Sequence, residues 1–99
     1  MIKPEEFIKQ NESTIVKIVD AFISRQEAVI ENNGYAYEVL TMTNCAAGLL
    51  DEIGLRVQNH FAKSLWDVSC EIDKRNRKIS FEITPSKKPM ARPKTSYGY

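Results

Sequence analysis

The sequence has few of the residues on which small catalytic and metal-binding sites depend. It contains one histidine, His60, and two cysteines, Cys45 and Cys70, among 99 residues. No CxxC or HxxxH spacing joins them, so nothing predicts a metal site. The four glycines form neither a phosphate-binding loop nor a dinucleotide fingerprint, and no serine lies in a nucleophile elbow. We therefore expect no metal, no cofactor and no enzymatic activity.

Long hydrophobic runs are also missing. The apolar runs are only a few residues long, which is too short for a membrane span. The residues Lys3 to Glu6 are not followed by the apolar stretch of a secretory signal. We expect two reduced cysteines in the core, with a disulfide or a reactive thiol as the alternatives. These features predict a cytoplasmic protein without a membrane partner.

Charge is present in ordinary amount but is unevenly distributed. The chain is 42% hydrophobic and 27% charged, and its formal net charge is +1. Residues 73–99 carry eight basic and two acidic side chains, a net charge of +6, whereas residues 1–72 carry six basic and eleven acidic ones, a net −5. Such asymmetry is typical of a chain with a basic segment that meets an anionic partner.

The clearest structural pattern is a β-hairpin from Trp66 to Thr84. Apolar and polar residues alternate along both halves of this stretch. The apolar positions are Val68, Cys70, Ile72, Ile79, Phe81 and Ile83. With a two-residue loop at Arg75-Asn76, Ile72 pairs with Ile79, Cys70 with Phe81 and Val68 with Ile83. A shift of one residue would oppose apolar to polar side chains, so the pattern favours this register.

Helical spacing of apolar residues runs from Pro4 to Glu31. One straight helix of that length would measure about 42 Å, which is long for so small a domain. We therefore expect a break near Asn11–Ser13, or a protruding N-terminal part whose Phe7 and Ile8 pack on a second copy. Asn32-Asn33-Gly34 then ends the helix, because these residues tolerate the left-handed conformation.

A strand and a second helix fill the middle of the chain. Tyr35–Met42 is rich in aromatic and β-branched residues, and both of its faces carry apolar side chains. This suits a strand that is covered on both sides or lies at a subunit contact. Thr43 or Asn44 is the expected cap of a helix over 45–63.

Together these elements predict one α+β domain over residues 1–85, in the order α-β-α-β-β. We expect a three-stranded sheet, mixed or antiparallel, with both helices on one face. Residues 86–99 form a basic tail with two prolines, and we expect it to be extended and disordered on its own.

The candidate binding residues are cations and aromatics in two places. The hairpin tip has Lys74, Arg75, Arg77 and Lys78, and the tail has Lys87, Lys88, Arg92, Lys94, Tyr97 and Tyr99. Cations neutralise phosphates and aromatic rings stack on bases, so tip and tail together favour nucleic acid as the partner. An acidic protein surface, including that of a second copy, is the alternative. For the tip alone, a solvated loop that protects a sheet edge is the simpler interpretation.

Three functional hypotheses follow. The first is a non-enzymatic protein that binds nucleic acid through tip and tail. The second is a structural, assembly or inhibitory protein that binds another protein or itself through the N-terminal helix, the open sheet face and the tail. Accessory proteins of phages and mobile elements fit this description by association. The third and weakest is a small enzyme that uses Glu38, His60 or Cys45.

Overall fold

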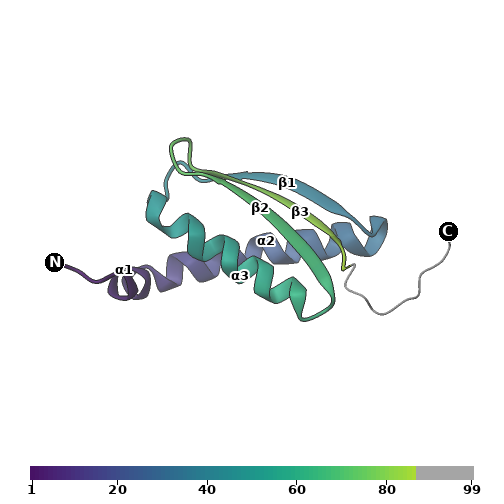
Figure 1. Ribbon diagram of the computed structural model, residues 1–99, viewed down its shortest axis with the longest axis horizontal. Helices are drawn as coiled ribbons and strands as arrows, with labels where there is room; N and C mark the ends of the chain where they lie inside the picture. Colours follow the sequence, from purple (N-terminus) through teal and green to yellow (C-terminus); the bar gives the residue numbers. More distant parts are fainter. Residues whose placement is uncertain (87–99) are drawn as a thin grey trace.

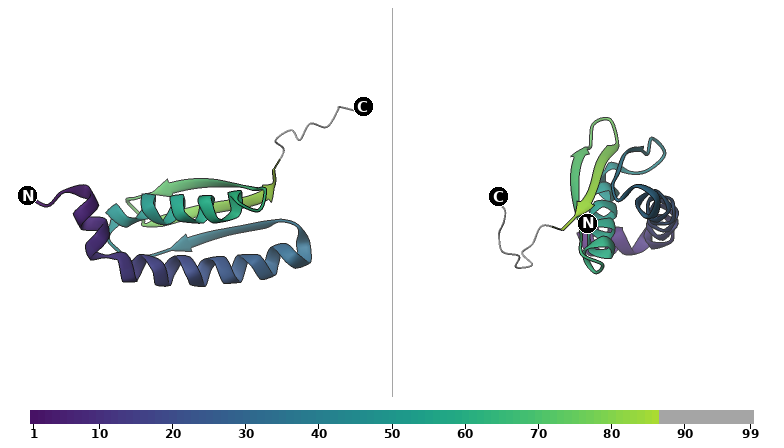
Figure 2. Two further views of the ribbon diagram at one scale, coloured as in Figure 1. Left: turned by 90° about the horizontal axis from the view of Figure 1, so that it is seen from below. Right: turned by 90° about the vertical axis from the view of Figure 1, so that its right-hand side faces the viewer.

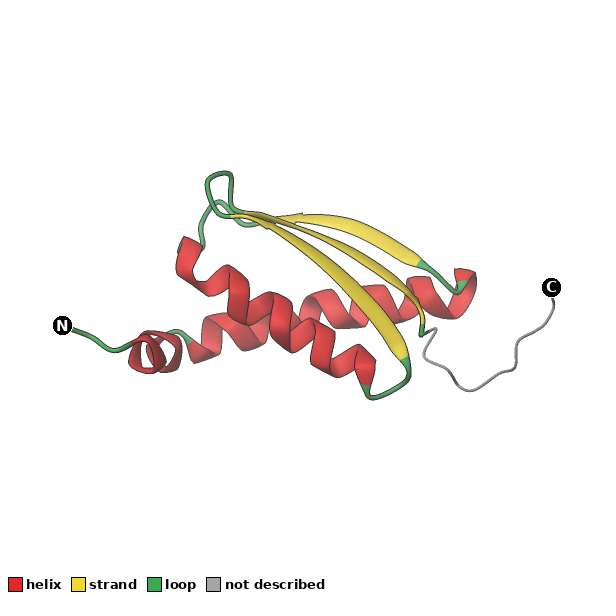
Figure 3. Cartoon of the chain, viewed as in Figure 1, coloured by secondary structure: helices red, strands yellow, loops and turns green. Residues whose placement is uncertain are grey.

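The computed structural model describes residues 1–86 and contains the expected helices and strands (Figures 1 and 3). The elements in chain order are α1 (Pro4–Gln10), α2 (Glu12–Asn33), β1 (Ala36–Thr41), the short 3-10 helix η1 (Ala47–Leu49), α3 (Leu50–Ala62), β2 (Trp66–Asp73) and β3 (Lys78–Pro85). The α+β class and the predicted order are confirmed, with the first predicted helix divided into α1 and α2.

The three strands form one antiparallel sheet in the order β1-β3-β2. The last strand, β3, therefore lies in the middle, and β1 and β2 are the two edges. Figure 2 shows α2 and α3 on the same side of this sheet, as predicted. The opposite side carries no helix in the part of the chain that the structure describes.

The predicted hairpin register is confirmed. Cys70 pairs with Phe81, Ile72 with Ile79 and Val68 with Ile83. The buried residues Ile79, Phe81 and Ile83 lie on the face of β3 toward the helices, whereas Cys70 on the edge strand is only half-buried.

The loop of this hairpin is longer than predicted. The ladder ends at the pair of Asp73 with Lys78, so four residues rather than two connect the strands. Asn76 closes the loop, because its backbone N–H and its Nδ2 donate to the two carboxylate oxygens of Asp73 over 3.1 and 2.8 Å. Arg77 completes the turn with a left-handed φ of 56°.

The predicted break in the N-terminal helix lies at Asn11. Its side chain Nδ2 donates to the carbonyl of Phe7 over 2.9 Å, which replaces a helical hydrogen bond and ends α1. Figure 2 shows the change of direction between α1 and α2. It allows Phe7 of α1 to approach Gly48 of η1. A Cβ at Gly48 would lie 3.1 Å from Phe7 Cε2. Phe7 and Ile8 are thus partly buried on the core of their own chain.

Of the other two helix boundaries predicted from the sequence, one is confirmed and one is wrong. Gly34 ends α2 in the left-handed conformation, with φ 68° and its N–H donating to the Ile30 carbonyl over 2.7 Å. The predicted start of the second helix at Cys45 is wrong, because α3 begins at Leu50 and neither Thr43 nor Asn44 caps it. Cys45 instead lies in the loop between β1 and η1, where its side chain is buried. The chain therefore buries Cys45 from a loop and not from the first turn of a helix.

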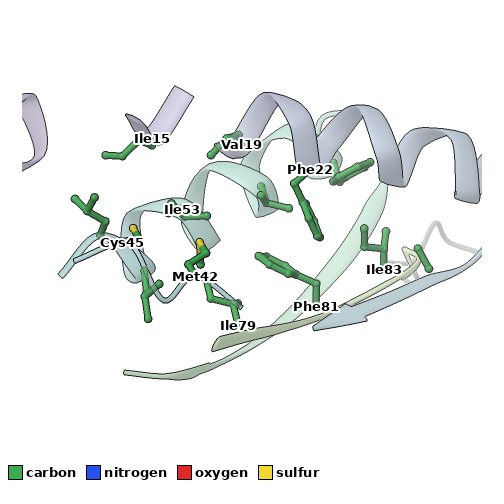
Figure 4. Close-up of a cluster of buried hydrophobic side chains, with 14 of the residues drawn as sticks. Ile15, Val19, Phe22, Met42, Cys45, Ile53, Ile79, Phe81 and Ile83 are labelled. Atoms are coloured by element: carbon green, nitrogen blue, oxygen red, sulfur yellow. The ribbon is translucent and has the colours of Figure 1, made fainter. Parts of the chain in front are cut away.

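The core lies between the sheet and the two long helices. Phe22 of α2 and Phe81 of β3 are 1% exposed, and their ring centroids are 4.5 Å apart (Figure 4). The buried apolar side chains around them include Ile15, Val19, Ile53, Val57, Ile79 and Ile83. These six residues come from α2, α3 and β3. Ala36 of β1 is also buried in the cluster, and Val68, Cys70 and Ile72 of β2 pack partly buried against it.

An arginine cluster joins α3 to the start of α2. Arg56 donates to both carboxylate oxygens of Glu12 over 2.8 Å and to Glu52 over 2.7 Å. The hydrogen bond from Arg56 lowers the pKa of Glu12, and the two carboxylates raise the pKa of Arg56. The cluster therefore favours the charged forms of Glu12 and Arg56 and holds the first turn of α2 against α3.

Phe81→Ala tests the packing of the central strand. We expect a loss of about 3–5 kcal/mol in the free energy of unfolding, because the substitution leaves a cavity beside Phe22. Chemical denaturation followed by circular dichroism measures it. Val39→Ala on the exposed face of β1 is the matched control and should cost less than about 1 kcal/mol. A small loss for Phe81→Ala would contradict the assigned core.

Both cysteines are free thiols in the structure, and their reactivity gives a second test. Burial raises the pKa of Cys45 and raises that of Cys70 to about 11. At pH 8 little thiolate is present, so native protein should react with iodoacetamide much more slowly than an unfolded sample. Mass spectrometry of unfolded protein, without reductant, should then show two alkylated thiols. Fast native alkylation, or a mass with a disulfide, would refute this.

Candidate functional site

The hairpin tip, residues 74–78, brings four of the predicted cations together, but the fold already uses most of them. Lys74 Nζ lies 2.8 Å from Asp51 Oδ2 at the start of α3. Arg77 Nη1 donates to the Thr43 carbonyl over 3.3 Å, and Lys78 lies across the ladder from Asp73. Among residues 1–86, no acidic side chain pairs with the guanidinium of Arg75.

Asp73 gives the tip its shape and lowers its positive charge. The hydrogen bonds from Asn76 lower the pKa of Asp73, and the nearby ammonium of Lys78 acts in the same direction. The carboxylate therefore stays ionised well into acid. With Asp51 and Asp73 beside four cations, the tip has a net charge of about +2, less than its sequence indicates.

The tip and the tail leave the sheet at opposite ends. β3 begins at the tip with Lys78 and ends at Pro85, a length of about 24 Å. The predicted tail residues Lys87, Lys88, Arg92, Lys94, Tyr97 and Tyr99 lie outside the described residues. The structure thus brings the tip cations together and separates them from the point where the tail starts (Figure 1).

Between these two ends lies the sheet face that no helix covers, which we call the open face. Strand alternation turns most of the polar residues of the three strands toward it. Its outward residues are Tyr37, Val39 and Thr41 of β1, Lys78, Ser80, Glu82 and Thr84 of β3, and Asp67, Ser69, Glu71 and Asp73 of β2. Four carboxylates against one ammonium make the open face acidic.

The β1 side of the open face is aromatic. Tyr37 is 58% exposed and Val39 is 42% exposed. Tyr35 O–H donates to Glu82 Oε2 over 2.9 Å, and this bond raises the pKa of Tyr35. At the other end of the face, a shallow hollow of about 490 Å³ is lined by Glu71, Ile72, Asp73, Lys78 and Ser80. The face can therefore offer aromatic contact and negative charge to one partner.

The three residues considered as catalytic candidates do not lie in one site. Glu38 projects from β1 toward α2, where Arg25 Nη2 donates to it over 2.6 Å and Gln26 also donates. His60 on α3 lies 2.8 Å from Glu27, and Cys45 is buried near Met42. No hydrogen bond joins any two of the three within residues 1–86. Each has a structural partner instead.

His60 does border a groove between the ends of α2 and α3. The groove measures about 340 Å³ and is lined by Glu27, Ile30, Glu31, His60, Phe61, Ser64 and Trp66. His60 bonds to Glu27, and no bond connects it to Ser64 in the described part of the chain. The carboxylates of Glu27 and Glu31 beside the indole ring of Trp66 are suited to contact with a cation. They are less suited to a reaction that needs an activated nucleophile.

Residues 1–86 contain no group of three or more histidine, cysteine and acidic side chains that could hold a metal ion. No helix there has both the length and the hydropathy that crossing a membrane requires.

Sequence analysis missed the acidity of the open face. The alternation that turns Cys70 and Phe81 inward also turns Asp67, Glu71 and Glu82 outward, so the pattern was sufficient to find them. What it could not supply was the strand order, which places Tyr37 beside Glu82. The pairing of Lys74 with Asp51 also joins residues 23 positions apart, and no local pattern predicts it.

Comparison of this chain with protein-family models, with curated proteins and with solved structures found no match in any of the three.

Proposed function

We propose that this protein is a non-enzymatic, cytoplasmic binding protein that engages nucleic acid through the hairpin tip and the C-terminal tail. The observation that carries the proposal is the tip itself. It extends beyond the helices in Figure 1, and its Arg75 guanidinium has no acidic partner within residues 1–86. A solvated guanidinium on a projecting loop is suited to a phosphate contact.

Charge limits where that contact can lie. Residues 1–86 contain ten basic and thirteen acidic side chains, a net charge of −3, whereas residues 87–99 contain four basic and no acidic ones. The open face would repel a phosphate backbone. Binding therefore depends on two short basic segments, the tip and the tail, and the tail begins about 24 Å from the tip, at the other end of β3.

A second function is favoured by a different observation. Tyr37 and Val39 are exposed side by side with carboxylates on the open face, which suits a protein partner better than an unpaired surface. In this version the protein is an assembly or inhibitory component, of the kind that phages and mobile elements encode. Its partner would carry basic and apolar residues.

The tip gives the direct test of nucleic-acid binding. Replacing Arg75 and Lys78 with Ala should reduce the magnitude of the slope of log K against log salt by about 1.8 for duplex DNA, from about 0.9 per lost phosphate contact. The control replaces Lys17 and Lys63, two exposed lysines on the helical side, with Ala. Fluorescence anisotropy at several salt concentrations measures both variants.

The control should leave the slope unchanged, because its lysines lie away from the tip. An equal effect of both variants would show that net charge, rather than the tip, drives binding. If the full-length protein shows no salt-dependent binding to DNA or to RNA, the nucleic-acid function is wrong.

Contact between copies through Phe7 and Ile8 stays a prediction. Both side chains pack on their own core but keep part of their surface exposed. If they also meet a second copy, light scattering should give a dimer mass for the whole chain and a monomer mass without residues 1–10. Circular dichroism of the shortened chain checks that it still folds. Equal monomer masses for the whole and the shortened chain would contradict a contact through Phe7 and Ile8.

A further inference from the structure

The groove between the ends of α2 and α3 combines apolar and aromatic side chains with two carboxylates. Ile30 and Phe61, which line it, are 8% and 3% exposed, and Trp66 beside them is half-buried. Glu27 and Glu31 lie one turn apart on α2, and both are exposed. The volume of about 340 Å³ lies at the lower end of the range for ligand sites in proteins.

The carboxylates of this groove are only partly compensated within the domain. Glu27 Oε2 lies 2.8 Å from His60 Nε2, whereas Glu27 Oε1 has no hydrogen-bond partner in residues 1–86. Glu31 forms neither an ion pair nor a side-chain hydrogen bond in the same part of the chain. Lys63 is close to His60 in sequence but does not line the groove. Because like charges one turn apart on a helix repel each other, the groove favours an added cation.

The ends of the two helices strengthen this negative potential. α2 ends at Asn33 and α3 at Ala62, so the last turns of both helices border the groove (Figure 1). The C-terminal end of a helix carries a partial negative charge, and an acidic side chain there adds to it. Glu31 lies in the last turn of α2, which contains no basic residue. A cation in the groove would therefore be stabilised by the carboxylates and by both helix ends.

Trp66 determines which kind of cation suits the groove. Indole is the strongest aromatic partner of a cation, and a planar guanidinium stacks on its face while it donates to a carboxylate. A metal ion would need more oxygen ligands than Glu27 and Glu31 supply, and it would gain little from the ring. The combination of ring and carboxylates therefore favours the guanidinium of an arginine.

Leu65 indicates that this arginine belongs to a protein. It lies between Ser64 and Trp66 in the chain, has a left-handed φ of 67° and is 73% exposed. The left-handed conformation is unfavourable for leucine, and the exposed side chain adds little to the core of its own domain. An apolar side chain next to an acidic groove suits a partner with an apolar residue beside a basic one.

We propose that the groove binds an arginine side chain of a partner protein, with the guanidinium against Trp66 and between the carboxylates of Glu27 and Glu31. An apolar residue next to that arginine covers Leu65. This site goes beyond the proposed nucleic-acid binding and does not depend on it. Trp66 and Asp73 are the two ends of β2, so the groove lies about 23 Å from the hairpin tip.

The chain carries its own reporters of this site, because Trp66 is its only tryptophan and His60 its only histidine. The probe is the peptide acetyl-Gly-Arg-Leu-Gly-amide, added to the full-length protein at low salt. A single side chain binds weakly, so the titration extends to a concentration on the order of 10 mM. We expect saturable changes in the fluorescence of Trp66 and in the imidazole NMR signals of His60. The same peptide with citrulline, which is neutral, in place of arginine should cause neither change.

Other results of this titration would overturn the proposal. The absence of a saturable change, or an equal change with the citrulline peptide, would show that the groove does not recognise a guanidinium. Calcium ions that change both signals at lower concentrations than the peptide would assign the groove to a metal ion. Signals that change with protein concentration alone, together with a dimer mass, would place a second copy in the groove and refute a separate partner.

Removal of single charges tests the carboxylates. Glu31→Gln should weaken binding of the arginine peptide about two- to fivefold, as expected for one exposed ion pair, and Glu27→Gln in addition should weaken it further. Glu5→Gln on α1 removes the same charge away from the groove and is the control. Circular dichroism checks that each variant folds. An equal loss for Glu5→Gln and Glu31→Gln would show a general charge effect and would overturn the proposal.

A short DNA duplex separates this site from the proposed function. The duplex should leave the His60 signals unchanged, because the acidic groove repels phosphates. Peptide binding without DNA binding would support the groove and refute the proposed function. DNA binding without peptide binding would support the proposed function and refute the groove.

Discussion

The contact between Phe22 and Phe81 is the interaction on which the rest of the fold depends. It joins the longest helix to the central strand, and both rings are almost fully buried. The flanking residues Ile79 and Ile83 are buried in the same row of β3, which fixes which face of the sheet meets the helices. With the exception of Glu38 on β1, the polar side chains of the three strands then lie on the opposite face.

One carboxylate lies on the helical side of the sheet and needs its own compensation. Glu38 projects from β1 between Ala36 and Leu40, where an unpaired charge would be costly. Arg25 and Gln26 of α2 supply the hydrogen bonds, and the guanidinium of Arg25 also lies 5.4 Å from the centre of the Phe22 ring. The edge strand and the helix are therefore joined by charge at the same place where the aromatic rings pack.

A sheet covered on one side has consequences for function. Its other face displays every outward side chain of three strands, and in this chain most of the charged ones are acidic. The four tip cations lie at one end of that face. The acidic area beside them attracts cations and repels anions.

The sequence by itself determined the features that depend on neighbouring residues. Alternation specified the register around Cys70 and Phe81, Gly34 specified the end of α2, and Asn11 marked the break before it. For the site, it located the tip cations and turned Asp67 and Glu71 outward. Each follows from local backbone preference or side-chain periodicity, which act over a few residues.

Tertiary structure decided what depends on distant partners. It placed β3 between β1 and β2 and paired Lys74 with Asp51. It also set the start of α3 at Leu50, five residues after the predicted start at Cys45. These outcomes depend on how apolar faces and opposite charges from separate elements meet during packing. No pattern within a single element contains that information, because burial and ion pairing are decided by the whole domain.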